Sequence, residues 1–282
     1  MPAAAGAEFA VGRAPVLRGS AAGEGTPIVL CHGLTASRRY VVHGSRFLER
    51  EGHRVITYDA RGHGESDPAP AGQSYGYPEL IADLERVVEA EVGDGRFLLG
   101  GHSMGAHTAV GYALAHPERL SGLVVVGPTY TGEISAGALA YWDGLAAALE
   151  AGGLDGFVDY LMRKSGVAEA WRDGVAKASR QRMELHRNLG EMARALRETP
   201  ASRPFGSLTD LARLDVPALV VASHDEADPG HPYAVAESYA ETLPNARLIS
   251  EDVGQSPLAW QGGRLSREIS LFALEPDVAL SS

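Results

Sequence analysis

A five-residue turn, Gly101-His102-Ser103-Met104-Gly105, constrains this chain more than any other stretch. The apolar run 97–99 precedes it, and a segment rich in small residues follows it. This order predicts a buried strand, a sharp turn and a helix, which together hold a serine hydroxyl above the edge of a sheet. Such a turn strains the serine backbone and crowds its neighbours, so glycine is needed at 101 and 105. The N-terminus of the following helix is expected to point at the serine and to stabilise negative charge there.

Short β-prone runs alternate with helical patterns along most of the chain. Two short strands are expected within 8–18, buried strands over 28–31, 54–58, 97–99 and 123–127, and further strands over 217–222 and 246–250. Helices are expected over 38–51, 78–92, 232–243 and 263–274. Strands and helices that alternate at this spacing predict an α/β fold with a mostly parallel, doubly wound sheet.

Residues 129–205 carry a different pattern. They contain no β-prone run, and Ala, Leu, Arg and Glu dominate several helical segments. An all-helical insertion between two parts of a βαβ array predicts a cap over the sheet. We therefore expect a core formed by 1–128 and 206–282, with a helical cap over 129–205.

Composition excludes several classes of partner. The formal net charge of −11 argues against nucleic acid and against an anionic membrane. The single cysteine, Cys31, excludes an internal disulfide and fits a reducing compartment. No basic leader followed by an apolar core opens the chain, and no apolar run approaches the ~18 residues that span a bilayer. We expect a cytoplasmic protein that acts on a small molecule.

Further motifs surround the serine turn in a fixed order. His32-Gly33 follows the strand 28–31, and Asp59-x-Arg61-Gly62-His63-Gly64-x-Ser66 follows the strand 54–58. Acidic residues follow the strand 217–222. With these motifs the chain resembles the α/β-hydrolase superfamily, in its form with a helical cap after the sixth strand. The resemblance covers about residues 8–275, and in the cap it extends only to position and helical character.

The resemblance implies roles for the matching positions. Ser103 is expected to be the nucleophile, which attacks a carbonyl carbon and forms an acyl-enzyme. The backbone N–H groups of Leu34 and Met104 are expected to form the oxyanion hole. His32 and the polar stretch 59–66 are expected to brace the loops around the serine.

The acid of the catalytic triad is expected after the strand 217–222. Asp228 is favoured, because family members place this acid shortly before a proline that opens the next helix, as Pro232 does; Asp225 is the alternative. His224 and His231 lie beside these carboxylates and invite a metal interpretation. No second ligand cluster and no nucleotide or phosphate motif supports it, so neither a metal nor a cofactor is expected.

The expected catalytic histidine is missing. Family members carry it after the last strand, directly after a glycine, where this chain has Gln255 after Gly254. No histidine follows His231. Glutamine donates and accepts hydrogen bonds, but it does not take up a proton at neutral pH.

Three interpretations follow from this departure. In the first, His231 or, less well placed, His107 replaces the base. In the second, the scaffold binds a small molecule without efficient turnover. In the third, it catalyses a lyase or isomerase step that needs polarisation but no strong base. We expect a serine hydrolase of esterase, lactonase or thioesterase type with an apolar or acyl substrate, and keep the other two as alternatives.

Overall fold

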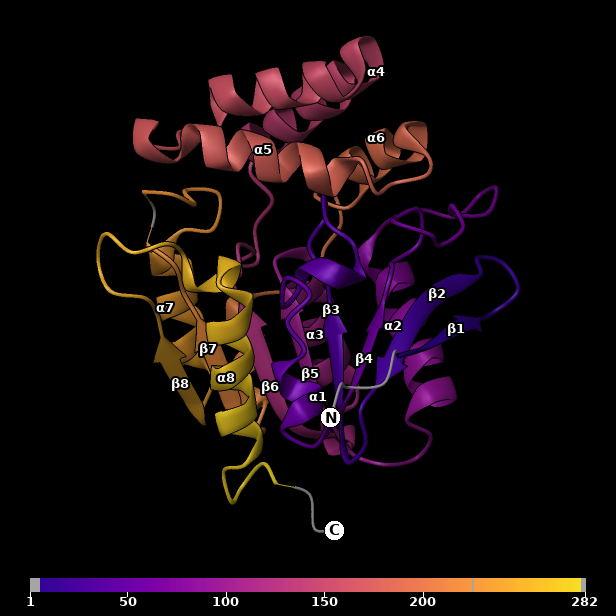
Figure 1. The fold of residues 1–282 in the computed structure, drawn as a ribbon, viewed down its shortest axis with the longest axis vertical. Coiled ribbons are helices and arrows are strands. Elements are labelled where there is room, and N and C mark those ends of the chain that lie inside the picture. Colours follow the sequence, from indigo (N-terminus) through magenta and orange to yellow (C-terminus); the bar gives the residue numbers. More distant parts are fainter. Residues whose placement is uncertain (1–5, 225, 280–282) are drawn as a thin grey trace.

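A single sheet forms the centre of the protein (Figure 1). The structure, a computed structural model, describes residues 6–224 and 226–279. Its strands are β1 (Ala7–Val11), β2 (Leu17–Ala22), β3 (Thr26–Cys31), β4 (His53–Tyr58), β5 (Phe97–His102), β6 (Leu120–Val126), β7 (Ala218–Val221) and β8 (Ala246–Ile249). They lie in the order β1-β2-β4-β3-β5-β6-β7-β8, and from β4 to β8 every neighbouring pair is parallel. The predicted doubly wound, mostly parallel sheet is confirmed.

Helices cover both faces of this sheet (Figure 1). The α-helices are α1 (Phe47–Arg50), α2 (Tyr77–Glu91), α3 (Met104–Ala115), α4 (Ala136–Lys164), α5 (Arg172–Met183), α6 (Leu189–Glu198), α7 (Tyr233–Thr242) and α8 (Gly262–Ala273). Short 3-10 helices are η1 (Arg38–Tyr40), η2 (Pro117–Arg119), η3 (Glu169–Trp171), η4 (Leu208–Arg213) and η5 (Leu258–Trp260). Side chains of α2, α3 and α7 join one apolar core, and those of α1 and α8 join the core on the opposite face.

The period of two in the strands explains why both faces are apolar. In β3, Val29 and Cys31 belong to the core beneath α2 and α3, whereas Ile28 and Leu30 belong to the core beneath α1 and α8. All four side chains are almost fully buried. A strand with apolar residues at every position is stable only when helices cover both sides, so the continuous run 28–31 already required this architecture.

The helix predicted over 38–51 is wrong. The structure forms η1, a turn and the four-residue α1 in its place. His43 (φ 48°) and Gly44 (φ 71°) adopt left-handed backbone, which no α-helix accommodates. A ring nitrogen of His43 contacts the carbonyl oxygen of Ala259 at 3.1 Å, so a contact with the distant η5 outweighs the local helical pattern.

Between β6 and β7 the described chain forms only helices, turns and loops. Figure 1 shows α4, α5 and α6 as a separate layer above one end of the sheet, the end from which α3 begins; we call these three helices the helical layer. A left-handed backbone at Gly153 (φ 58°) divides α4 into two parts. Among the described residues, no helix combines the length and apolarity that crossing a membrane requires.

Candidate active site

Ser103 lies at the junction of β5 and α3, as the turn motif predicts. Its backbone has φ 53° and ψ −115°, outside the regions that residues with side chains ordinarily occupy. Two hydrogen bonds hold it there: its N–H donates to Val126 O at 2.9 Å, and its carbonyl accepts from the N–H of His107 at 3.0 Å. Strain that the surrounding hydrogen bonds maintain is typical of functional positions.

The two glycines of the turn are required by close backbone contacts. A Cβ atom on Gly101 would lie 2.2 Å from the carbonyl carbon of Gly105. A Cβ atom on Gly105 would lie 2.1 Å from the carbonyl oxygen of Cys31. The crowding predicted at both positions is therefore present, and it brings the start of α3 directly against the end of β3.

Two backbone N–H groups in the segments around Ser103 have no hydrogen-bond acceptor within the described chain. Met104 is the first residue of α3, so its N–H has no acceptor within the helix. Leu34 lies in the loop after β3. The N–H groups of Leu34 and Met104 donate no hydrogen bond within the described chain. Both residues are buried, and their N–H groups have no acceptor within the described chain.

His32 fixes the direction of the Leu34 N–H. One ring nitrogen, Nδ1, donates to the carbonyl oxygen of Gly33 at 2.8 Å, and Nε2 accepts the N–H of Ala60 at 2.9 Å. The Gly33 carbonyl belongs to the same planar peptide as the Leu34 N–H, so holding one orients the other. Burial lowers the pKa of His32 to about 3, which keeps Nε2 available as an acceptor. The bracing role predicted for His32 is confirmed.

The polar stretch 59–66 also braces loops. The Asp59 carboxylate binds the guanidinium of Arg38 at 2.6 Å, and Arg61 forms a two-pronged ion pair with the buried Asp83 at 2.7 Å for both hydrogen bonds. A ring nitrogen of His63 lies 2.8 Å from the carbonyl oxygen of Leu34. These side chains are engaged in structural contacts, as predicted.

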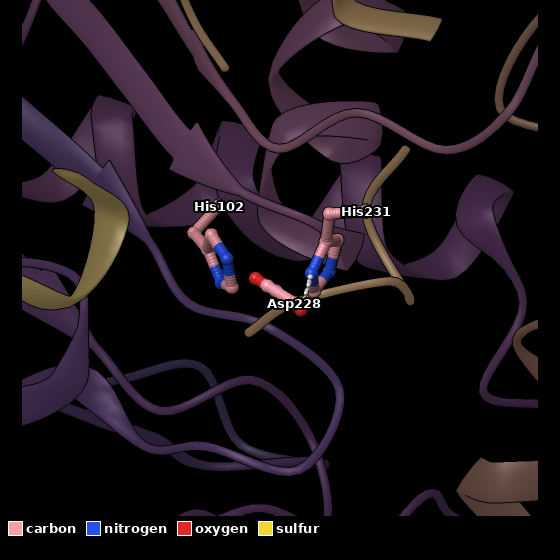
Figure 2. Close-up of side chains that lie close together, drawn as sticks. All are labelled: His102, Asp228 and His231. Atoms are coloured by element: carbon pink, nitrogen blue, oxygen red, sulfur yellow. Dashed lines mark hydrogen bonds and ion pairs between the residues drawn. The ribbon is translucent and has the colours of Figure 1, made fainter. Parts of the chain in front are cut away.

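A cluster of His102, Asp228 and His231 lies at the same end of the sheet (Figure 2). His102 is the last residue of β5, and the other two come from the loop between β7 and α7. His231 Nδ1 donates to Asp228 Oδ1 at 2.9 Å, and the two imidazole rings have centroids 4.8 Å apart. Figure 2 shows the carboxylate group of Asp228 between the two rings. Of the predicted acids, Asp228 thus has a histidine partner, while Asp225 lies outside the described residues.

Burial and charge set the protonation of this cluster. Burial raises the pKa of Asp228, but the charge and hydrogen bond of His231 outweigh it and hold this pKa below its ordinary value. Burial is also the main reason that the pKa of His102 lies well below its ordinary value. The Nε2 atom of His102 is buried, and no hydrogen-bond partner for it occurs among the described residues.

The helical layer contributes an arginine to this region. Arg182 of α5 donates from Nη2 to Ser179 Oγ at 3.1 Å, and its Nε is buried without a partner in the described chain. Burial lowers the pKa of Arg182, and the nearby negative charge of Asp228 partly offsets this effect. The same guanidinium charge helps to lower the pKa of His102.

Gln255 does not take the place of a catalytic histidine. Its side chain is exposed, donates to Asp252 Oδ2 at 3.1 Å and accepts from Arg264 Nη1 at 3.0 Å. Both of its polar groups are therefore engaged at the surface, and within the described residues no hydrogen bond connects it to Ser103.

The alternative base His107 is ruled out by its contacts. Its Nδ1 lies 2.8 Å from the hydroxyl of Tyr77, and its Nε2 accepts the N–H of Thr129 at 2.9 Å. Burial lowers its pKa to about 3. Both nitrogens of His107 thus connect α3 to its surroundings, and this histidine has no lone pair left for a serine.

The sequence reasoning missed His102. It grouped His224 with the acidic loop, yet the His224 ring stacks on Tyr233 with centroids 5.2 Å apart and does not join the cluster. A signal was available, because β5 and β7 are parallel and lie on either side of β6, so the residues that follow them meet at one edge of the sheet. The side-chain direction of His102 could not be read from that pattern.

Buried neutral histidines make the fold sensitive to acid. His186, which follows α5, accepts the N–H of Gly64 through Nδ1 at 3.0 Å, and burial lowers its pKa to about 3, as it does for His32 and His107. Below pH 6.5 the unfolded chain binds protons that the folded chain rejects, so stability falls as the pH falls. At pH 5 each of these histidines should cost about 2 kcal/mol relative to pH 7.5.

Urea unfolding at pH 7.5 and pH 5 measures this loss. His186→Asn retains an acceptor for the Gly64 N–H and removes the titrating ring, so its loss between the two pH values should be about 2 kcal/mol smaller than that of the parent protein. An unfolding free energy of the parent that is equal at both pH values would contradict the prediction.

Comparison with known proteins agrees with this geometry. The family model described as alpha/beta hydrolase fold matches residues 26–260. An sn-1-specific diacylglycerol lipase, ABHD11, of Danio rerio is 35% identical over 105 residues, which are 37% of this chain and 32% of that protein. Epoxide hydrolase B of Mycobacterium tuberculosis is 31% identical over 109 residues, 39% of this chain and 30% of that protein. The chain thus spans about a third of the length of these relatives.

Solved structures share the fold over nearly the whole chain. An esterase from Thermogutta terrifontis has a TM-score of 0.76 and 24% identity, covering 95% of this chain and 98% of that one. An enol-lactonase from Burkholderia xenovorans LB400 has a TM-score of 0.70 and 20% identity, covering 96% and 99%. The serine turn, the sheet order and the match over 26–260 together lead to one conclusion: this chain belongs to the α/β-hydrolase fold family.

Proposed function

We propose that this protein is a serine hydrolase that cleaves a carboxylic ester or a related acyl bond through an acyl-enzyme on Ser103. One observation carries the proposal: Ser103 has the strained backbone of a nucleophile turn, beside the N–H groups of Leu34 and Met104, which lack acceptors. Attack of the serine oxygen on a carbonyl carbon turns the carbonyl oxygen into an oxyanion. The two N–H groups then stabilise that charge, and they need no reorganisation to do so.

In this proposal, His231 and Asp228 replace the missing base. The His231 Nδ1–H donates to Asp228, which leaves the lone pair on Nε2, and Nε2 forms no hydrogen bond within the described chain. His231 packs against His102, the chain neighbour of Ser103. His231 accepts the serine proton, passes it to the leaving group, and then activates water to release the acyl group.

The surroundings favour an apolar acyl group. The Leu34 and Met104 side chains belong to an apolar cluster that they share with the helical layer. Members of this cluster from the layer include Leu145, Leu149, Phe157, Met192 and Leu196. We propose that 129–205 acts as a cap that covers the acyl part of the substrate. The relatives include a lipase and an esterase, and the serine at 103 does not suit the epoxide-hydrolase mechanism, which needs an aspartate nucleophile.

A fluorophosphonate probe tests the nucleophile directly. The folded protein should become labelled once per chain, with the adduct on Ser103 in peptide mass spectra, and Ser103→Ala should abolish the labelling. Ser135 is an exposed serine that caps the N-terminus of α4, and the variant Ser135→Ala should be labelled to the same extent as the parent. A folded parent protein that stays unlabelled but binds small esters would overturn the proposal. It would favour a binding scaffold, or a lyase or isomerase that does not use an activated serine.

A further inference from the structure

We propose that His102, Asp228 and His231 form a binding site for a transition-metal dication such as Zn²⁺, and that the bound metal blocks hydrolysis. One potential ligand atom from each residue lies within 4.8 Å of those of the other two. Figure 2 shows the two imidazoles and the carboxylate group converging on one region. The three side chains come from two distant segments, so their convergence is a product of the fold.

An unsatisfied atom points to a ligand at this place. His102 Nε2 is buried and has no hydrogen-bond partner among the described residues. A buried polar atom without a partner destabilises the folded state. A metal ion bound through this nitrogen would remove that cost.

Gly127 leaves room for the two rings. Its left-handed backbone (φ 54°) follows β6, and a Cβ atom there would lie 3.3 Å from His231 Cγ and 3.4 Å from His102 Nε2. A side chain at this position would therefore fit tightly against His231 and be in ordinary van der Waals contact with His102. The absence of one lets the rings approach each other from β5 and from the loop before α7.

The donor set suits zinc and its neighbours. Two imidazole nitrogens and one carboxylate oxygen match zinc sites that keep a fourth position for water, with bonds of about 2.0–2.2 Å. Two ligand atoms in such a tetrahedron lie roughly 3.3 Å apart. His231 Nδ1 and Asp228 Oδ1 are 2.9 Å apart, and one ligand atom from each of the three residues lies within 4.8 Å of the other two. Imidazole ligands favour Zn²⁺, Co²⁺ or Ni²⁺ over Mg²⁺ and Ca²⁺.

The positive charge of Arg182 weakens the binding of a metal cation at this site. Its guanidinium acts electrostatically on both His102 and Asp228. A positive charge near the site disfavours a dication, so we expect a reversible site that a chelator empties. Replacing Arg182 with methionine keeps much of the packing volume and removes the charge, which should tighten the binding of metal.

The inhibitory consequence rests on the proposed function. A metal on His231 Nδ1 takes the lone pair of that nitrogen, so the neutral imidazole carries its single proton on Nε2 and no longer on Nδ1. His231 then no longer has the tautomer that a base requires, and Asp228 no longer orients it. Zn²⁺ should therefore inhibit ester hydrolysis, and EDTA should restore it.

Metal titration of the untagged protein, stripped with EDTA, tests the site without substrate. Calorimetry with Zn²⁺ and the visible absorption of Co²⁺ should both report one site per chain. His102→Gln, Asp228→Asn and His231→Gln should each weaken binding by at least about 10-fold. His116→Gln is the matched control, because it removes a half-exposed histidine that lies 3.6 Å from Glu85 and 3.9 Å from Glu118 at the other end of α3.

The outcomes separate the metal site from the proposed function. Ser103→Ala should bind Zn²⁺ like the parent, so binding is measurable even in a protein that hydrolyses nothing. Circular dichroism of the metal-free variants establishes that they are folded; if His102→Gln does not fold, the Asp228 and His231 variants carry the test. Binding that survives all folded cluster variants, or that disappears in His116→Gln, would overturn the proposal. So would weaker binding in Arg182→Met.

Discussion

His231→Gln should lower kcat on an activated ester by about 10⁴- to 10⁶-fold, the range seen when a serine hydrolase loses a member of its catalytic triad. The reason is geometric. His231 donates a hydrogen bond from Nδ1 to the carboxylate of Asp228. Its Nε2 forms no hydrogen bond within the described residues, so this nitrogen keeps a lone pair that can accept a proton. Glutamine has a similar reach but takes up no proton, so Ser103 would attack as a neutral hydroxyl. Steady-state kinetics with a p-nitrophenyl ester measure kcat and KM separately.

Gln255→Ala is the matched control for this experiment. The Gln255 side chain is exposed and bonded to Asp252 and Arg264, so its removal should change kcat by no more than about two-fold. Asp228→Asn should reduce kcat with little change in KM, because it affects the orientation of His231 and not substrate binding. If His231→Gln is as active as the parent and Gln255→His raises turnover by orders of magnitude, the base is not His231.

Gly105→Ala should destabilise the protein by more than about 4 kcal/mol or prevent folding altogether. The new Cβ would lie 2.1 Å from Cys31 O and 2.4 Å from Cys31 C, both backbone atoms in the central strand β3. A clash between two side chains can be relieved by rotating one of them. The clash here is with backbone atoms, so α3 or β3 itself must move. Urea unfolding followed by far-UV circular dichroism gives the free energy, and expression in the soluble fraction gives the extreme case.

Gly174→Ala makes the same substitution as Gly105→Ala, but here we expect the protein to become more stable. Gly174 lies within α5, and no atom lies within 4 Å of the position that its Cβ would take. Alanine there should stabilise the protein by about 0.5–1 kcal/mol, because glycine loses more backbone entropy in a helix. An unfolding midpoint of Gly105→Ala equal to that of the parent would contradict the close packing of α3 on β3.

Elements whose stability is local were predictable. The run 28–31 is apolar at every position, so it had to be a strand covered on both faces, and β3 is such a strand. The glycines at 101 and 105 indicated crowding before any contact was known, and the contacts of both are backbone contacts. In each case the chemistry of a few consecutive residues leaves one conformation open.

Elements that depend on distant partners were not predictable in the same way. The helical pattern over 38–51 gave way to left-handed backbone at His43 because that residue contacts Ala259, more than two hundred positions away in the chain. Gln255 was recognised as a departure, but its direction toward solvent follows from Arg264 on α8. The local contact with Asp252 became visible only together with this packing of α8.

By itself, the sequence determined the order of strands and helices, the strained serine turn and the absence of a histidine after the last strand. These follow from periodicity, from backbone sterics and from residue identity. Only the tertiary structure decided that His107 is engaged in packing, that His231 pairs with Asp228, and that His102 lies beside both. Side chains at the ends of separate strands meet only after the parallel sheet has aligned those ends, and their directions depend on atoms that the sequence places far away.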